Sequence, residues 1–94
     1  MTDELNKWRQ EIYLSASRFH AEMAKYFAAL TGDTSAGDID ATKRAAREAG
    51  NYYNVALVSF LKHLKTLPLG AELRAEAERA ERTISLLSFE LSQL

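Results

Sequence analysis

Apolar residues recur along the first third of the chain at steps of three and four residues. This spacing has the period of one face of an α-helix. The members of the stripe are Leu5, Trp8, Ile12, Ala16, Phe19, Met23, Tyr26 and Leu30. Gly32 follows where a residue in the left-handed conformation commonly ends a helix. The pattern predicts one long helix over residues 3–30.

A second stripe of the same period follows a short polar segment. Its members are Ile39, Thr42, Ala46, Ala49, Tyr53, Ala56, Phe60, Leu64 and Leu67. Asp38 can cap the start of this helix, and Pro68 disfavours the helical conformation at Leu67. These signals predict a helix over 38–67. Gly50 lies in its middle, where glycine costs about 1 kcal/mol relative to alanine, so both a kink and a continuous helix stay open there.

A third stripe begins shortly after Pro68 and alternates four- and three-residue steps. Its members are Leu73, Ala77, Ala80, Ile84, Leu87, Leu91 and Leu94. This is the spacing of a heptad seam, and it predicts a helix over 70–93. Because the connections are short, consecutive helices should be antiparallel neighbours. We therefore expect an all-α protein, an antiparallel three-helix bundle in which residues 1–94 form a single helical domain.

Composition and charge narrow the possible partners. Hydrophobic residues make up 47% of the 94 residues, while 12 basic and 13 acidic side chains leave a net charge of −1. The chain is too hydrophobic to be disordered, and its charge gives no general attraction to nucleic acid or to anionic membranes. No apolar run is long enough to span a bilayer, and the N-terminus lacks the pattern of a signal peptide. We expect a small soluble cytoplasmic protein with no membrane partner.

The residues that usually carry catalysis or bind metals are sparse. The chain has no cysteine and two histidines. His20 and His63 lie on the flanks of their stripes, where histidine normally places a polar tip in water. Neither belongs to a metal-binding motif such as HExxH. We expect no catalytic residue, no metal site, no cofactor and no small-molecule substrate, and therefore a protein that is not an enzyme.

Apolar residues outside the stripes are the more informative feature. Tyr13 and Leu14 lie outside the stripe of the first helix, and the other two helices show the same pattern. Several such residues on each helix suggest a second buried surface. The residues chosen as partner-binding candidates are Leu86, Phe89, Val55 and Val58, with Arg44, Arg47 and Lys62 around them. They predict a non-catalytic protein–protein interaction module that binds another protein or a second copy as a homodimer. Within that class, an adaptor, a small chaperone, an inhibitor and an assembly subunit stay open.

One alternative comes from a resemblance. The segment Leu5-Asn6-Lys7-Trp8-Arg9 resembles the opening of helical chorismate mutases, which have a similar length and three-helix layout. That resemblance implies a small enzyme that holds a dianionic substrate between its helices, with Arg9 and Lys25 as the anion contacts. The sequence departs from the family pattern at residues 12–15, where Ile-Tyr-Leu-Ser replaces an acidic repeat.

A second alternative rests on basic residues of the second helix. Arg44, Arg47, Lys62 and Lys65 fall roughly opposite its core stripe at about 100° per residue. Such a strip would suit an acidic protein or a phosphate backbone. The net charge of −1 argues against nucleic acid. A nucleic-acid-binding helical bundle is therefore kept only as an alternative.

Overall fold

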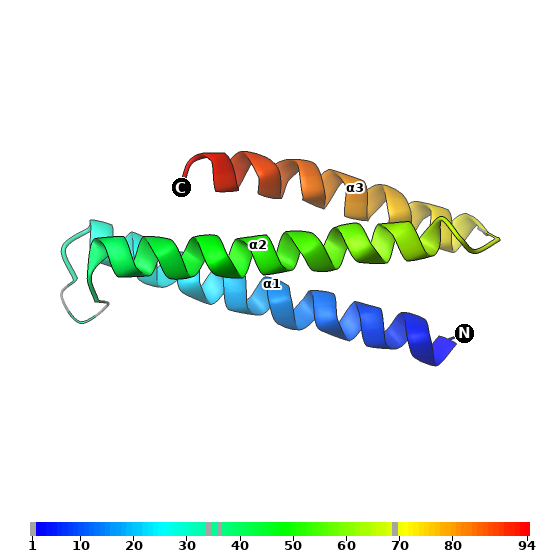
Figure 1. Cartoon of the computed structure of the whole chain (residues 1–94), viewed down its shortest axis with the longest axis horizontal. Coiled ribbons are helices and arrows are strands. Elements are labelled where there is room, and N and C mark those ends of the chain that lie inside the picture. Colours follow the sequence, from blue (N-terminus) through cyan, green and yellow to red (C-terminus); the bar gives the residue numbers. More distant parts are fainter. Residues whose placement is uncertain (1, 34, 36, 69) are drawn as a thin grey trace.

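The computed structural model describes residues 2–33, 35, 37–68 and 70–94. Within these ranges the chain forms the helices α1 (Thr2–Leu30), α2 (Ile39–Leu64) and α3 (Ala71–Ser92), and no strand. The order of the helices along the chain is easily followed in Figure 1. The expected all-α three-helix fold is confirmed.

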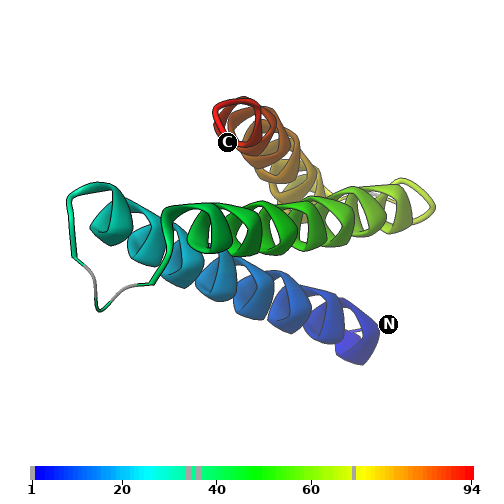
Figure 2. The same cartoon turned by 60° about the vertical axis from the view of Figure 1, so that its left-hand side comes forward.

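The central helix of the arrangement is α2. Both α1 and α3 pack against it, each antiparallel to it, and they approach it from different sides (Figure 1, Figure 2). The shorter α3 stops before it reaches the connection between α1 and α2 (Figure 1). The molecule is elongated, with extents of 50 × 24 × 16 Å. In the part of the chain that is described, no helix combines the length and the apolarity that crossing a membrane requires.

Two apolar clusters hold the helices together. The first joins all three helices through Phe19, Ala49, Tyr53, Leu57 and Leu87. The second lies nearer the α2–α3 connection and consists of Leu5, Phe60, Leu64 and Ala77. All of these buried residues except Leu57 belong to the stripes read from the sequence. Burial of apolar surface at this spacing is what turns three amphipathic helices into one core.

Gly50 allows the helices to approach one another closely, and α2 runs through it without interruption. A Cβ atom placed on Gly50 would lie 2.5 Å from Cδ2 of Leu91 and 2.9 Å from Cε1 of Phe19. These two side chains come from α3 and α1, so both neighbours occupy the space that any larger residue would need. The open question about a kink is therefore answered by a continuous helix.

The end of α2 differs from the expected boundary. The helix ends at Leu64, three residues before the predicted end at 67. The amide N–H of Thr66 donates to the carbonyl oxygen of His63 at 3.0 Å, and that of Leu67 donates to Leu64 at 3.1 Å. The side-chain hydroxyl of Thr66 also donates to His63, at 2.6 Å. This tighter turn before Pro68 replaces the last turn of the predicted helix.

The other ends follow the sequence signals closely. Asp38 is the N-cap of α2, and its side chain accepts from the amide N–H of Asp40. Gly32 has a positive φ of 94° just after α1, as the left-handed end of a helix requires. Two stripe residues near this end are nevertheless exposed, Leu30 at 49% and Ile39 at 44%. Leu30 ends α1 and Ile39 begins α2, and α3 does not reach this end of the α1–α2 pair (Figure 1).

Candidate protein-binding surface

Large apolar side chains are exposed on every helix. The large apolar residues that are exposed in the described chain are Tyr13, Leu14, Phe27, Leu30, Ile39, Tyr52, Val55, Leu86 and Phe89. Single exposed apolar residues are normal on a protein surface, but groups of them mark surfaces that bind other molecules. The question is therefore which of these residues lie together.

The C-terminal half of α3 has the sharpest contrast between inner and outer faces. Leu87 is 2% exposed, whereas Leu86 and Phe89 are each 66% exposed. Successive residues of a helix are turned by about 100°, so Leu87 reaches the core while Leu86 lies on the flank and Phe89 on the back. Leu86 also lines a shallow hollow on α3 with Glu78, Glu81, Arg82 and Ser85. We call Arg82, Ser85, Leu86, Phe89 and Glu90 the outer face of α3.

The apolar residues on the back of α2 lie elsewhere. Val55 is 62% exposed and lies in a hollow between α1 and α2. Tyr52 in the same hollow donates a hydrogen bond to the carboxylate of Glu11 on α1. Val58 is only half-buried. Val55 and Leu86 line two different hollows, so the outer face of α3 is considered by itself.

The four basic residues of the strip expected from the sequence, Arg44, Arg47, Lys62 and Lys65, divide into two kinds. Arg47 donates to the carbonyl oxygen of Leu94, and Nζ of Lys65 lies 3.9 Å from a carboxylate oxygen of Glu81. The first contact joins α2 to the last residue of the chain sequence, just after α3, and the second joins the residue that follows α2 to α3. Arg44 and Lys62 are exposed and form no ion pair with any described residue. The strip expected to meet an acidic partner is therefore reduced to these two residues, about 27 Å apart along the helix axis.

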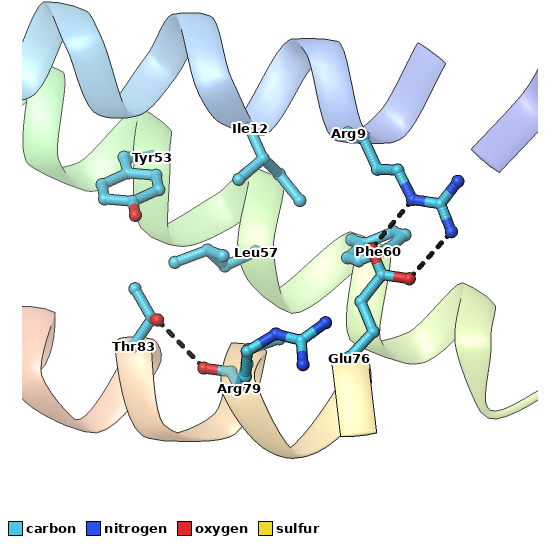
Figure 3. A pocket seen from close by; sticks show the side chains of 9 residues that line it. Arg9, Ile12, Tyr53, Leu57, Phe60, Glu76, Arg79 and Thr83 are labelled. Atoms are coloured by element: carbon cyan, nitrogen blue, oxygen red, sulfur yellow. Dashed lines mark hydrogen bonds and ion pairs between the residues drawn. The ribbon is translucent and has the colours of Figure 1, made fainter. Parts of the chain in front are cut away.

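A cleft opens between α1 and α3 over the floor that α2 provides. It has a volume of about 300 Å³, and its floor consists of Tyr53, Leu57 and Phe60. Arg9 and Glu76 close one edge, as Figure 3 shows. Nε and Nη2 of Arg9 each donate to a different carboxylate oxygen of Glu76 at 2.9 Å. This two-point ion pair ties the N-terminal half of α1 directly to α3.

The ion pair changes the acidity of both partners. The hydrogen bond to Glu76 raises the pKa of the Arg9 guanidinium, and the hydrogen bond from Arg9 lowers the pKa of the Glu76 carboxyl. Arg79, which also lines the cleft, adds a smaller lowering of the Glu76 pKa through its charge. The anion that Arg9 contacts is therefore a side chain of this chain itself.

The two residues named for the chorismate-mutase-like alternative do not converge. Lys25 lies 3.6 Å from Glu22 on the same helix, while Arg9 is held by Glu76 across the cleft. Sixteen residues separate them on α1, which places them about 24 Å apart. One small dianion cannot reach both. The geometry therefore gives that alternative no shared anion site.

The two histidines are placed apart from each other. His63 stacks on Trp8 at a ring-centroid distance of 6.0 Å, and its Nε2 lies 3.5 Å from the carboxylate of Glu4. His20 is exposed beside Phe19. No group of three metal-ligating side chains occurs among the residues whose positions are described. The Trp8–His63 contact instead belongs to the packing of α1 on α2.

Sequence reasoning missed the side-chain links between helices. The Arg9–Glu76 pair spans 67 positions of sequence, and the Tyr52–Glu11 pair spans 41. A helix pattern shows which face a residue occupies but not its level against a neighbouring helix. The antiparallel order of the helices was the one available signal, because it places the start of α1 near the start of α3.

In comparisons with known proteins, the chain matches no family model, no curated protein and no solved structure.

Proposed function

We propose that this protein is a non-catalytic binding module that docks against another protein or a second copy through the outer face of α3. The observation that carries the proposal is the pair Leu86 and Phe89. Each is 66% exposed although Leu87, between them in sequence, is 2% exposed. Full burial of a leucine or phenylalanine side chain is worth about 1.5–3 kcal/mol. Two such residues on one outer face supply a driving force for association.

The polar surroundings suit a docking surface. Arg82, Ser85 and two glutamates line the hollow beside Leu86. An apolar centre with a polar rim is the usual composition of a protein–protein interface, and rim charges mainly set association rate and partner choice. The apolar centre gives affinity, and Arg82 gives discrimination between partners.

Val55, Val58 and the basic residues take a secondary place in this proposal. Val55 and Tyr52 form a separate apolar site between α1 and α2. Arg44 and Lys62 are two exposed basic residues of α2 that form no ion pair with a described residue, and they can steer an acidic partner towards the molecule. We place the function in the cytoplasm, which a chain without cysteine suits.

A matched pair of charge insertions tests the proposal. Phe89→Glu places a carboxylate in the docking surface, and Tyr13→Glu places one at a site on α1 that is exposed to a similar degree, 70%. Each variant and the wild type are immobilised and exposed to the purified chain and to an extract of the cells that produce it. Circular dichroism of each variant checks that helicity is retained.

The wild type and Tyr13→Glu should retain the same protein, whether the chain itself or another, and Phe89→Glu should lose it. The proposal is wrong if the folded wild type retains nothing that Phe89→Glu loses. A Phe89→Glu variant that unfolds would show instead that Phe89 supports the core. In that case Leu86→Glu, changed at the neighbouring exposed site, takes its place in the same comparison.

A further inference from the structure

We propose that the occupant of the outer face of α3 is a second copy of this chain, docked antiparallel with Leu86 on the two-fold axis. This inference rests on the proposed function and makes it specific. A two-fold interface uses the same patch on both partners, so the patch must be complementary to itself. The outer face of α3 meets that condition.

The charges of α3 are arranged symmetrically about Leu86. Arg82 lies four residues before Leu86 and Glu90 four residues after it. At 1.5 Å per residue, both lie about 6 Å from the level of Leu86. In an antiparallel pair centred on Leu86, Arg82 of each copy therefore lies level with Glu90 of the other. The interface gains two opposite-charge pairs by symmetry.

Phe89 fits the same arrangement. It follows Arg82 by seven residues, or nearly two helical turns, so both point from the same side of α3. In the antiparallel pair, Phe89 of one copy comes level with Arg82 of the other to within about 1.5 Å along the axis. The aliphatic stem and guanidinium of Arg82 can then cover the phenyl ring. Both large exposed side chains of the outer face are thus buried by one docking mode.

The residues needed for docking are free to take part. Arg82 and Glu90 are exposed, and neither is in an ion pair with another described residue. Figure 2 shows α2 on one side of α3 and no other helix on the side facing away from it. The net charge of −1 adds almost no repulsion between two copies. No ion pair of the described residues thus competes with a second copy for Arg82 and Glu90.

The weak internal packing of α3 favours the same conclusion. Its described buried residues are Ala77, Ala80 and Leu87, of which only Leu87 is large, whereas α2 buries nine residues. The cap of α3 at Gly70 makes no side-chain hydrogen bond to the helix. A second copy would cover the opposite side of this helix and stabilise it.

Charge reversal in two separate chains tests the geometry. Arg82→Glu alone creates two like-charge contacts across the two-fold axis, and so does Glu90→Arg alone. Each variant by itself should therefore self-associate at least about tenfold more weakly than the wild type. Mixed in equal amounts, the two variants should associate to within about threefold of the wild type, because every charged contact in the mixed pair is again between opposite charges.

Sedimentation velocity on the full chain measures these affinities. Arg74→Glu reverses a charge of α3 outside the outer face and should leave self-association unchanged, while circular dichroism checks helicity. A second measurement uses the absence of cysteine from the chain. Leu86→Cys should form an intermolecular disulfide on mild oxidation, since the two copies of this position face each other. Ser88→Cys, which is exposed outside the outer face, should not.

The outcomes separate this inference from the proposed function. Loss of association in each single variant and its recovery in the mixture support the two-fold pairing. If the wild type self-associates but the reversals have no effect, the pairing is wrong and the binding role stands. If the wild type stays a single copy at every concentration, the second copy is excluded. The proposed function then depends on the comparison of Phe89→Glu with Tyr13→Glu in the extract.

Discussion

Arg9 of α1 and Glu76 of α3 face each other across the cleft and form two hydrogen bonds of 2.9 Å. They connect the two helices that otherwise meet mainly through α2. The side chain of Glu76 is only 19% exposed and that of Arg9 is 40% exposed. The pair therefore fixes the level of α3 against α1 at the end of the bundle where the N-terminal halves of both helices lie.

Removing the charge of Glu76 should weaken the fold in a pH-dependent way. Because Arg9 lowers the Glu76 pKa, the ionised carboxylate stabilises the folded state above the pKa of about 4.5 of an unfolded glutamate. This contribution is lost as the pH falls through the lower pKa of the folded state. We expect Glu76→Gln to reduce the free energy of unfolding by about 0.5–1 kcal/mol at pH 7.

Urea unfolding at a series of pH values measures the difference. The gap between wild type and Glu76→Gln should narrow as the pH falls below about 4.5. Glu78→Gln is the control, because Glu78 is exposed and has no ion pair among the described residues. Equal effects of the two substitutions at every pH would show that the contact with Arg9 contributes nothing to stability.

Gly50→Ala should destabilise the protein although alanine is the better helix former. The new methyl group would lie 2.5 Å from Leu91 and 2.9 Å from the ring of Phe19, which is 1% exposed and cannot easily move. Overpacking of this kind costs about 1–3 kcal/mol, against a gain of about 1 kcal/mol in helix propensity. We expect a net loss of about 1 kcal/mol in the free energy of unfolding.

The same unfolding measurement on Gly70→Ala provides the control. Apart from its chain neighbours, no described residue lies within 4 Å of a Cβ placed on Gly70, so Gly70→Ala should cost only the N-cap preference of glycine over alanine, about 1 kcal/mol or less, and this cost should be the same with leucine or alanine at residue 91. In a Leu91→Ala background the cost of Gly50→Ala should shrink, since the nearest clash is removed. A stabilising Gly50→Ala would mean that Phe19 and Leu91 do not meet at this residue.

Truncation of two adjacent leucines of α3 should lower the free energy of unfolding by very different amounts. Leu87→Ala removes a side chain that is 2% exposed and should lower the free energy of unfolding by about 3 kcal/mol. Leu86→Ala removes one that is 66% exposed and should cost less than about 0.5 kcal/mol in dilute protein. Urea titration of both variants at low concentration makes the comparison. Similar losses for the two would contradict the orientation of α3.

The helices and their inner faces could be predicted because apolar spacing depends only on local geometry. Phe19, Leu64 and Leu87 all belong to the stripes and are 0–2% exposed. Gly50 could not be interpreted in the same way, since its local cost in a helix left both a kink and a continuous helix open. The reason for a glycine at residue 50 is the close approach of Phe19 and Leu91, which come from two other helices. A sequence pattern along one helix contains no information about such neighbours.

The candidate surface was only partly predictable for the same reason. Leu86 and Phe89 could be placed outside the core, because the apolar stripe that contains Leu87 shows which face of this helix is buried. The hollow that contains Val55 could not be predicted, because it depends on how α1 lies against α2. The exposure of Leu30 and Ile39 depends on where α3 ends relative to the other helices. Helix lengths that differ by a few residues decide such details.

The mass of the unmodified chain in solution tests the central claim most directly. Sedimentation equilibrium over a wide range of concentration should give twice the chain mass of 10.6 kDa at high concentration, falling towards 10.6 kDa on dilution. Such a transition is what a self-complementary outer face of α3 predicts. A mass of 10.6 kDa at every concentration would contradict the pairing of two copies through Leu86.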